Sequence, residues 1–155
     1  MIRFFVPGDP TPKGRPRATA TIKEEIKMTR YGPIIARRAR PRLYMPSATI
    51  EGEERVRAAF MEKYHVDPAT GPLRLEMTAY FKPPKNLRAA IARGEIYAER
   101  IPDGDNLLKL VMDALEGVVY YNDKQIVSWH GKKVYGMPEG VLIIIDRINV
   151  IGGCA

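Results

Sequence analysis

The chain has 155 residues with 45% hydrophobic and 28% charged side chains, which is typical of one soluble globular domain and excludes a disordered polyelectrolyte. Its longest apolar runs are far too short to span a membrane, and no charged segment followed by an apolar segment marks a secretory signal at its start. A single cysteine, Cys154, excludes an internal disulfide, and with only two histidines a structural zinc site is not expected, so we expect a cytoplasmic protein.

The net charge of +7 is concentrated in residues 10–43. This segment has ten Lys or Arg against Glu24 and Glu25, and the remainder of the chain has fifteen basic and sixteen acidic side chains. Five prolines and the lack of a sustained apolar period predict a long basic loop, or arm, over residues 10–43. This basic segment can be interpreted as a solvated loop without a binding role, or as a segment that binds a polyanionic partner.

Regular elements are expected on both sides of this arm. We expect strands over residues 2–6 and 73–81, a helix over residues 47–64 capped by Ser47, a short helix from Asn86 to Gly94, and a helix from Asp103–Asn106 to Gly117. Two further strands, over residues 125–135 and 141–150, are expected to form a hairpin through residues 136–140. This order predicts an α+β domain in which a small mixed β-sheet packs with helices.

The helix after Pro102 begins with two acids two residues apart, Asp103 and Asp105, and Lys109 follows one turn later. Helix capping explains one such acid, and a surface pair between Asp105 and Lys109 is a second plain interpretation. Two adjacent carboxylates repel each other, however, unless a cation lies between them. We expect the chain to fold Asp123 back toward them, and three carboxylates of this kind suit Mg²⁺ or Mn²⁺ beside a phosphodiester.

Several segments together resemble RusA-type Holliday junction resolvases. The resemblance is carried by Pro102-Asp103-x-Asp105-Asn106-Leu107-x-Lys109, by Asp113-Ala114-Leu115-x-Gly117 and by Asn122-Asp123-x-Gln125-Ile126. The segment Phe5-x-x-Gly8-x-Pro10-x-Pro12-Lys13-Gly14-Arg15-Pro16-Arg17 is similar to the family's first strand and basic loop. Tyr44-x-Pro46-Ser47 and Lys133-x-Tyr135-Gly136 with Gly140-Val141 are similar to its first helix and closing hairpin, so the likeness covers most of the chain.

The resemblance implies a homodimeric, often prophage-borne endonuclease of recombination and repair that places paired nicks across four-way DNA junctions. It implies a RusA-like single domain over residues 1–155, a Mg²⁺ ion (or Mn²⁺) held by Asp103, Asp105 and Asp123, and Lys109 as the assisting base or charge stabiliser. We expect Lys13, Arg15, Arg17 and Lys133 to contact DNA, and Asn106, Asp113 and Asn122 to support the residues of the site without touching the metal. Asp113 is expected to be a structural residue or to orient Lys109. Asn122 departs from the family, in which many members carry a second Asp there.

Three alternatives remain open at this stage. One is a related nuclease that selects flaps or forks, and another is a branched-DNA-binding protein without catalysis. The third is an interaction domain whose acids are only helix caps. Tyr31, Tyr44 and Trp129 could stack on bases, although packing within the protein is the plainer interpretation of each.

Overall fold

A computed structural model of the protein describes residues 1–148. The predicted end of the last strand at residues 149 and 150, and Cys154, lie outside the described residues. The elements follow in the order β1 (Ile2–Pro7), β2 (Arg17–Thr29), β3 (Gly32–Tyr44), α1 (Ser47–Met61), β4 (Leu73–Phe81), η1 (Lys85–Leu87), α2 (Arg88–Ile91), α3 (Gly104–Leu115), η2 (Asp123–Gln125), β5 (Ile126–Tyr135) and β6 (Gly140–Arg147). Within the described part of the chain, no helix is both long and apolar enough to cross a membrane.

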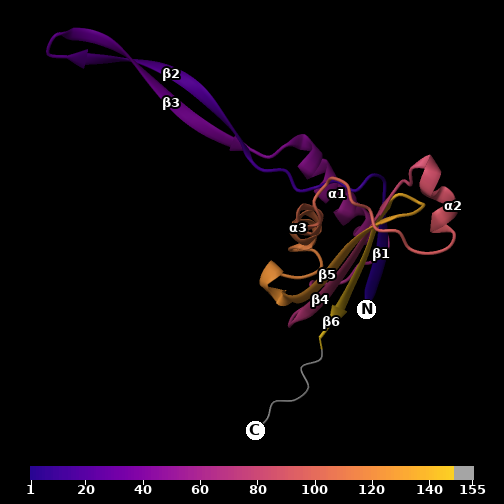
Figure 1. Cartoon of the computed structure of the whole chain (residues 1–155). Helices are drawn as coiled ribbons and strands as arrows, with labels where there is room; N and C mark the ends of the chain where they lie inside the picture. The colour runs from indigo at the N-terminus through magenta and orange to yellow at the C-terminus, as the bar shows by residue number, and fades with distance from the viewer. Residues whose placement is uncertain (149–155) are drawn as a thin grey trace.

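Strand β4 forms the centre of a four-stranded mixed sheet with the order β1-β6-β4-β5. Its alternating sequence puts Leu75 and Met77 into the core and Arg74 and Glu76 on the opposite, exposed face, as predicted. Helices α1 and α3 pack over the buried face (Figure 1). Phe60 of α1 and Leu107 of α3 belong to the buried core that the helices and the sheet share. The domain is therefore α+β with a small mixed sheet, as the sequence predicts.

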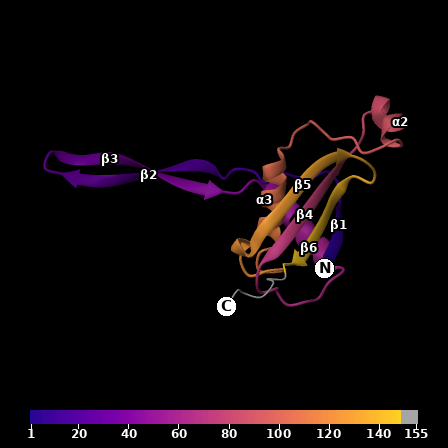
Figure 2. The ribbon, with the colours of Figure 1, turned by 60° about the horizontal axis from the view of Figure 1, so that its bottom comes forward.

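The expected hairpin between the last two strands is wrong. β5 pairs in parallel with one edge of β4, and β6 pairs in antiparallel fashion with the other edge. The short connection after Tyr135 therefore passes across the end of β4, as Figure 2 shows for these three strands. Two apolar strands and a short turn do not specify whether a third strand lies between them.

The expected basic loop is a β-hairpin over most of its length. Strands β2 and β3 pair in antiparallel register from Arg17↔Tyr44 to Thr29↔Gly32, and only residues 10–16 and the two turn residues 30 and 31 lie outside a strand. This two-stranded arm projects away from the body of the domain in both views (Figures 1 and 2). Almost all of its side chains are exposed, so the arm contributes no residue to the core of the domain.

The predicted caps of two helices are also wrong. Pro46 is the N-cap residue of α1, which leaves Ser47 inside the helix with no capping hydrogen bond from a side chain. The short α2 starts at Arg88 rather than at Asn86, which lies in the preceding 3-10 turn. Both predictions gave the right helices and misplaced their first residues by one or two positions.

Candidate active site and DNA-binding arm

Asp103 and Asp105 lie together at the N-terminus of α3. Asp103 is the N-cap residue, with φ −65° and ψ 144°, but its side chain accepts no capping hydrogen bond. Only its backbone carbonyl takes part, accepting from Leu107 at 3.2 Å. Both Asp side chains are exposed, and within residues 1–148 neither forms an ion pair. These carboxylates are therefore not used to cap the helix. The positive end of the helix dipole favours negative charge at this position.

Lys109 lies one turn along α3 from Asp105 and is exposed. The helix period places the two side chains on the same face. In the described structure, no ion pair joins Asp105 and Lys109. The interpretation of these two residues as a surface ion pair is therefore wrong. The buried face of the same helix carries Leu107, Leu110, Val111, Ala114 and Leu115. This amphipathic pattern holds Lys109 and the acid on the outside.

Asp123 lies at the opposite end of α3. It is the first residue of η2. The side-chain amide of the preceding residue, Asn122, donates to the carboxylate of Glu116 at 3.1 Å, and Glu116 directly follows the last residue of α3. Twelve helical residues separate that end from Asp103, which corresponds to about 18 Å along the axis. Among residues 1–148, no group of three or more His, Cys, Asp or Glu is arranged to hold a metal ion. A single chain therefore does not fold Asp123 back to Asp103 and Asp105.

Asn122 has a clear local role. Its side chain accepts a hydrogen bond from the backbone of Lys124 at 3.1 Å, and the side chain of Gln125 accepts from the backbone of Asn122, also at 3.1 Å. This reciprocal capping box fixes the turn that carries Asp123. The residue that departs from the family thus holds the turn in shape.

Lys133, rather than Asp123, returns to the start of α3. Its ammonium group donates to the backbone carbonyl of Arg100 at 2.5 Å and to that of Pro102 at 3.0 Å. These bonds tie β5 to the segment that leads into Asp103. The ammonium group predicted to contact DNA therefore positions the approach to the acids.

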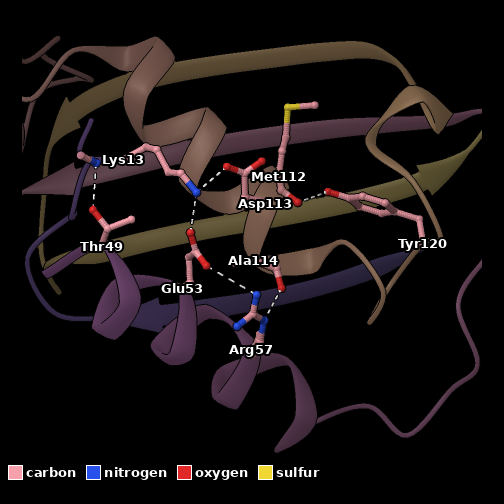
Figure 3. A network of polar contacts seen from close by, with 9 residues as sticks. Lys13, Thr49, Glu53, Arg57, Met112, Asp113, Ala114 and Tyr120 are labelled. Carbon is pink, nitrogen blue, oxygen red and sulfur yellow. Dashed lines mark hydrogen bonds and ion pairs between the residues drawn. The ribbon is translucent and has the colours of Figure 1, made fainter. Parts of the chain in front are cut away.

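Lys13 lies between two carboxylates rather than at the surface (Figure 3). Its ammonium nitrogen is 2.6 Å from Glu53 on α1 and 2.6 Å from Asp113 on α3. Burial disfavours the charged ammonium, but the hydrogen bonds to Asp113 and Glu53 outweigh it and raise the pKa of Lys13 above its usual value. Asp113 is thus engaged by Lys13 rather than by Lys109.

Glu53 and Arg57, which sequence analysis did not identify, extend this network. Arg57 lies 3.5 Å from Glu53 and donates to the carbonyl of Ala114 at 2.9 Å, so the network joins α1 to α3 (Figure 3). The backbone of Lys13 donates to the carbonyl of Asn106 at 2.9 Å. The root of the arm is thereby held against the first turn of α3, next to Asp105. The partners of Lys13 lie far from it in the chain, and no local pattern signals them.

The arm has two chemically different faces, because residues paired across β2 and β3 share a face and successive residues alternate. One face carries six basic side chains against the single acid Glu25; its basic residues are Arg17, Lys23, Lys27, Arg38, Arg40 and Arg42. The opposite face is apolar apart from an ion pair between Arg37 and Glu24 at 2.9 Å; its apolar residues are Ala18, Ala20, Ile22, Ile26, Met28, Pro33, Ile35, Ala39, Pro41 and Leu43. Arg15, at the root of the arm, is exposed.

The alternation of these two faces was available in the sequence. Residues 17–28 change between basic or polar and apolar at nearly every step, which is the period of a strand. Tyr31, at the tip, and Tyr44, at the base, are exposed, as is Trp129 on β5. The structure therefore does not bury any of the three aromatic residues that could stack on bases.

Comparison with known proteins supports one family. The family model described as "Endodeoxyribonuclease RusA" matches residues 7–146, which include Asp103, Asp105, Lys109 and Asp123. The chain is also 25% identical over 139 residues to "Uncharacterized protein YqaN" of Bacillus subtilis (strain 168), a match that covers 80% of this chain and 97% of that protein.

Proposed function

Because the chain belongs to the RusA endodeoxyribonuclease family, we propose that it is a metal-dependent endonuclease that resolves four-way DNA junctions by paired nicks. Family membership supports endodeoxyribonuclease activity and a junction-resolving role. The observation that carries the metal-dependent mechanism is the pair of exposed, uncapped carboxylates of Asp103 and Asp105 beside the root of a basic arm.

The donor chemistry of these two residues fits a divalent cation. Mg²⁺ in enzymes is typically held by one or two carboxylates, several waters and the phosphate oxygens of the substrate. Asp103 and Asp105 supply hard oxygen donors that no capping bond or ion pair uses within residues 1–148. When bound, Mg²⁺ or Mn²⁺ polarises the phosphodiester and lowers the pKa of the attacking water.

The neighbouring side chains have distinct roles in this proposal. Lys109, one turn from Asp105, offsets charge that develops on the phosphorus, a role for which a positioned donor is worth roughly 100- to 1000-fold in rate. Asn106 anchors the root of the arm through its carbonyl, and Asn122 holds the turn of Asp123. Lys133 positions the segment before Asp103 through its two carbonyl contacts.

We assign the DNA backbone contacts to Arg15, Arg17 and the basic face of the arm. These side chains are exposed, and evenly spaced cations on a ribbon suit a phosphate backbone. Lys13 is left out of this assignment because its ammonium group is held by Glu53 and Asp113. Such contacts supply affinity and orientation, so junction shape rather than base sequence would select the substrate.

A cleavage assay tests the proposal. Asp105→Asn is expected to lower Mg²⁺-dependent cleavage of a synthetic four-way junction by at least about 100-fold, because several kcal/mol of charge stabilisation disappear with the ligand. Junction binding should be retained or tighter, since a repulsive charge is removed. Asp67→Asn, another exposed Asp far from the start of α3, is the matched control and should cleave normally.

Three outcomes would contradict parts of the proposal. Normal cleavage by Asp105→Asn would refute the metal site, and equal cleavage without added Mg²⁺ or Mn²⁺ would refute metal dependence. Preferential cleavage of a flap or fork in the same series would replace the junction with a different branched substrate.

The salt dependence of junction binding tests the arm. Replacement of Arg38, Arg40 and Arg42 by Gln should lower the slope of log affinity against log salt by about 0.9 for each duplex phosphate that the arm no longer neutralises. Arg37→Gln is the matched control, because this residue lies on the apolar face and pairs with Glu24. An equal change of slope for the control would refute the assignment to one face.

A further inference from the structure

The tip of the arm, residues 26–35, combines exposed apolar side chains with positive charge. It contains two cations, Lys27 and Arg30, and no acid. Both views place the tip at the end of the arm farthest from the body of the domain, so the body does not cover it (Figures 1 and 2). Five large apolar side chains of the tip are each more than half exposed: Ile26, Met28, Tyr31, Ile34 and Ile35.

Tyr31 lies at the apex of the tip. Strand pairing ends at Thr29↔Gly32, which leaves Arg30 and Tyr31 as the two turn residues. The hydroxyl of Thr29 holds this turn, because it accepts from the backbone of Tyr31 at 3.3 Å and donates to the carbonyl of Gly32 at 2.8 Å. The Tyr31 side chain is 97% exposed. A short, hydrogen-bonded turn therefore presents an aromatic ring to the surroundings of the protein.

The tip is apolar on both of its faces. Ile26, Met28 and Ile35 lie on the apolar face of the arm, whereas Ile34 pairs with Lys27 on the basic face. A membrane or a flat protein surface contacts one side of a ribbon and would leave the other side in water. A narrow end with apolar groups on two sides is suited instead to enter a gap between two apolar surfaces.

Duplex DNA offers such a gap between two stacked base pairs. The faces of the bases are apolar and accept aromatic rings, and they lie between two rows of phosphates. Proteins that kink DNA insert apolar side chains between base steps in this way. Lys27 and Arg30 flank the apolar cluster and suit the phosphates beside the step. The basic face of the arm, which we assign to the phosphate backbone, also leads directly to this tip.

The tip and the proposed catalytic acids meet different parts of a bound substrate. The root of the arm is held beside the first turn of α3 by the bond from the backbone of Lys13 to the carbonyl of Asn106 at 2.9 Å. The thirteen residues of β2 then separate this root from the tip. The tip therefore reaches a duplex arm of the substrate rather than the phosphate that lies at Asp103 and Asp105.

We propose that the arm tip is a wedge that enters duplex DNA. Tyr31 inserts between two base pairs, Met28 and Ile34 contact the sugars on either side, and Lys27 and Arg30 neutralise the neighbouring phosphates. The inference rests on the proposed nuclease function and adds to it a site that kinks a duplex arm of the substrate. Because insertion breaks the stacking of one base step, steps that stack weakly are preferred there without any hydrogen bond to a base.

A mismatch moved along one duplex arm of a synthetic four-way junction tests the wedge. Affinity is measured without a divalent cation, so that cleavage does not interfere. The wild type should bind at least about 5-fold more tightly when the mismatch lies at one particular step, because a mismatched step is easier to unstack. Tyr31→Ala should lose this preference and bind the matched junction about 10-fold more weakly, since the stacking of one ring is lost.

Two variants serve as controls for Tyr31→Ala. Tyr31→Phe keeps the ring and should retain both the affinity and the preference for the mismatch. Tyr97→Ala removes a tyrosine of the body that is 65% exposed, and it should also behave like the wild type. Energy transfer between dyes at the two ends of the duplex arm gives a second readout. The wild type and Tyr31→Phe should shorten this distance by kinking the duplex, and Tyr31→Ala should not.

Each remaining outcome is decisive. Equal affinity of the wild type for every mismatch position, or an unchanged preference in Tyr31→Ala, would refute the wedge. If Tyr31→Ala leaves both DNA readouts unchanged but loses binding to phosphatidylglycerol vesicles, the tip binds a membrane instead and the wedge is refuted. In either case, cleavage of the junction with Mg²⁺ by the wild type leaves the proposed function standing. A wild type that neither binds nor cleaves branched DNA would refute both.

Discussion

Lys13→Met should destabilise the fold rather than weaken DNA binding. The substitution keeps the aliphatic stem and removes the ammonium that lies 2.6 Å from both Glu53 and Asp113. The Glu53 and Asp113 side chains are 17% and 28% exposed, so two partly desolvated carboxylates would be left close together. Arg57 still lies 3.5 Å from Glu53 and compensates in part.

The magnitude follows from these interactions. Hydrogen bonds to charged groups contribute about 1.5–3 kcal/mol each, and partial exposure together with Arg57 reduces the total, so we expect a decrease of about 2–3 kcal/mol in unfolding free energy. For a chain of this size, that decrease corresponds to a fall in Tm of roughly 5–10 °C. Urea denaturation followed by circular dichroism measures it directly.

Two comparisons make this test decisive. Arg15→Met removes an exposed basic side chain two residues away and should change the unfolding free energy by no more than about 0.5 kcal/mol. A triple variant, Lys13→Met with Glu53→Gln and Asp113→Asn, should recover much of the stability because it leaves no uncompensated carboxylate, and Arg57 keeps its hydrogen bond to the Ala114 carbonyl. If Lys13→Met unfolds like the wild type and instead lowers the salt slope of DNA binding, the network is not structural and Lys13 contacts phosphate.

Three further predictions concern the body of the domain. The pKa of Lys13 is raised in the folded protein, so the stabilisation that its charge provides is complete below 10.5, the pKa of a lysine in the unfolded chain, and is lost as the pH rises through the folded pKa. The free energy of unfolding of the wild type should therefore fall above about pH 10.5 more steeply than that of Lys13→Met, as urea denaturation at each pH would measure. Tyr120→Phe should cost about 1 kcal/mol in the same assay, because the buried hydroxyl donates to the Met112 carbonyl at 2.7 Å. Gly140→Ala should lower Tm strongly, because φ is +156° at this residue and an added Cβ would overlap the carbonyl oxygen of Val6. Gly94→Ala is the control and should leave Tm nearly unchanged, because a Cβ added at Gly94 meets open space.

Elements with one buried face were predictable from the sequence. The alternation in residues 73–81 and the apolar stripe of residues 107–115 both arise because one face meets the core. The arm has no buried face, but the alternation of basic or polar and apolar residues over 17–28 has the period of a strand, so the sequence held a signal for β2 that the expected loop did not use. The pairing of β5 and β6 with β4 depends on interactions between distant segments, which local patterns do not encode.

The candidate site was predictable only where its residues are close in sequence. Asp103 and Asp105 are neighbours in sequence, so their proximity in space is guaranteed by the helix that they begin. Asp123 was expected to lie near Asp103, but it follows the far end of α3. The chain runs back toward the start of α3 only along β5, which has ten residues, and the residue that reaches the start of the helix is Lys133. The ion-pair partners of Lys13 depend on how α1 packs against α3, which the sequence near Lys13 does not encode.

The length of the arm sets how far along a duplex the chain can reach. Each of its strands has thirteen residues, which at about 3.3 Å per residue extends roughly 43 Å from the body. At about 3.4 Å per base pair, this distance matches approximately a dozen base pairs, or a little more than one helical turn. The DNA footprint of the protein should therefore extend one turn beyond the cleaved phosphates, and an arm shortened at its tip should shrink that footprint without moving the position of the nick.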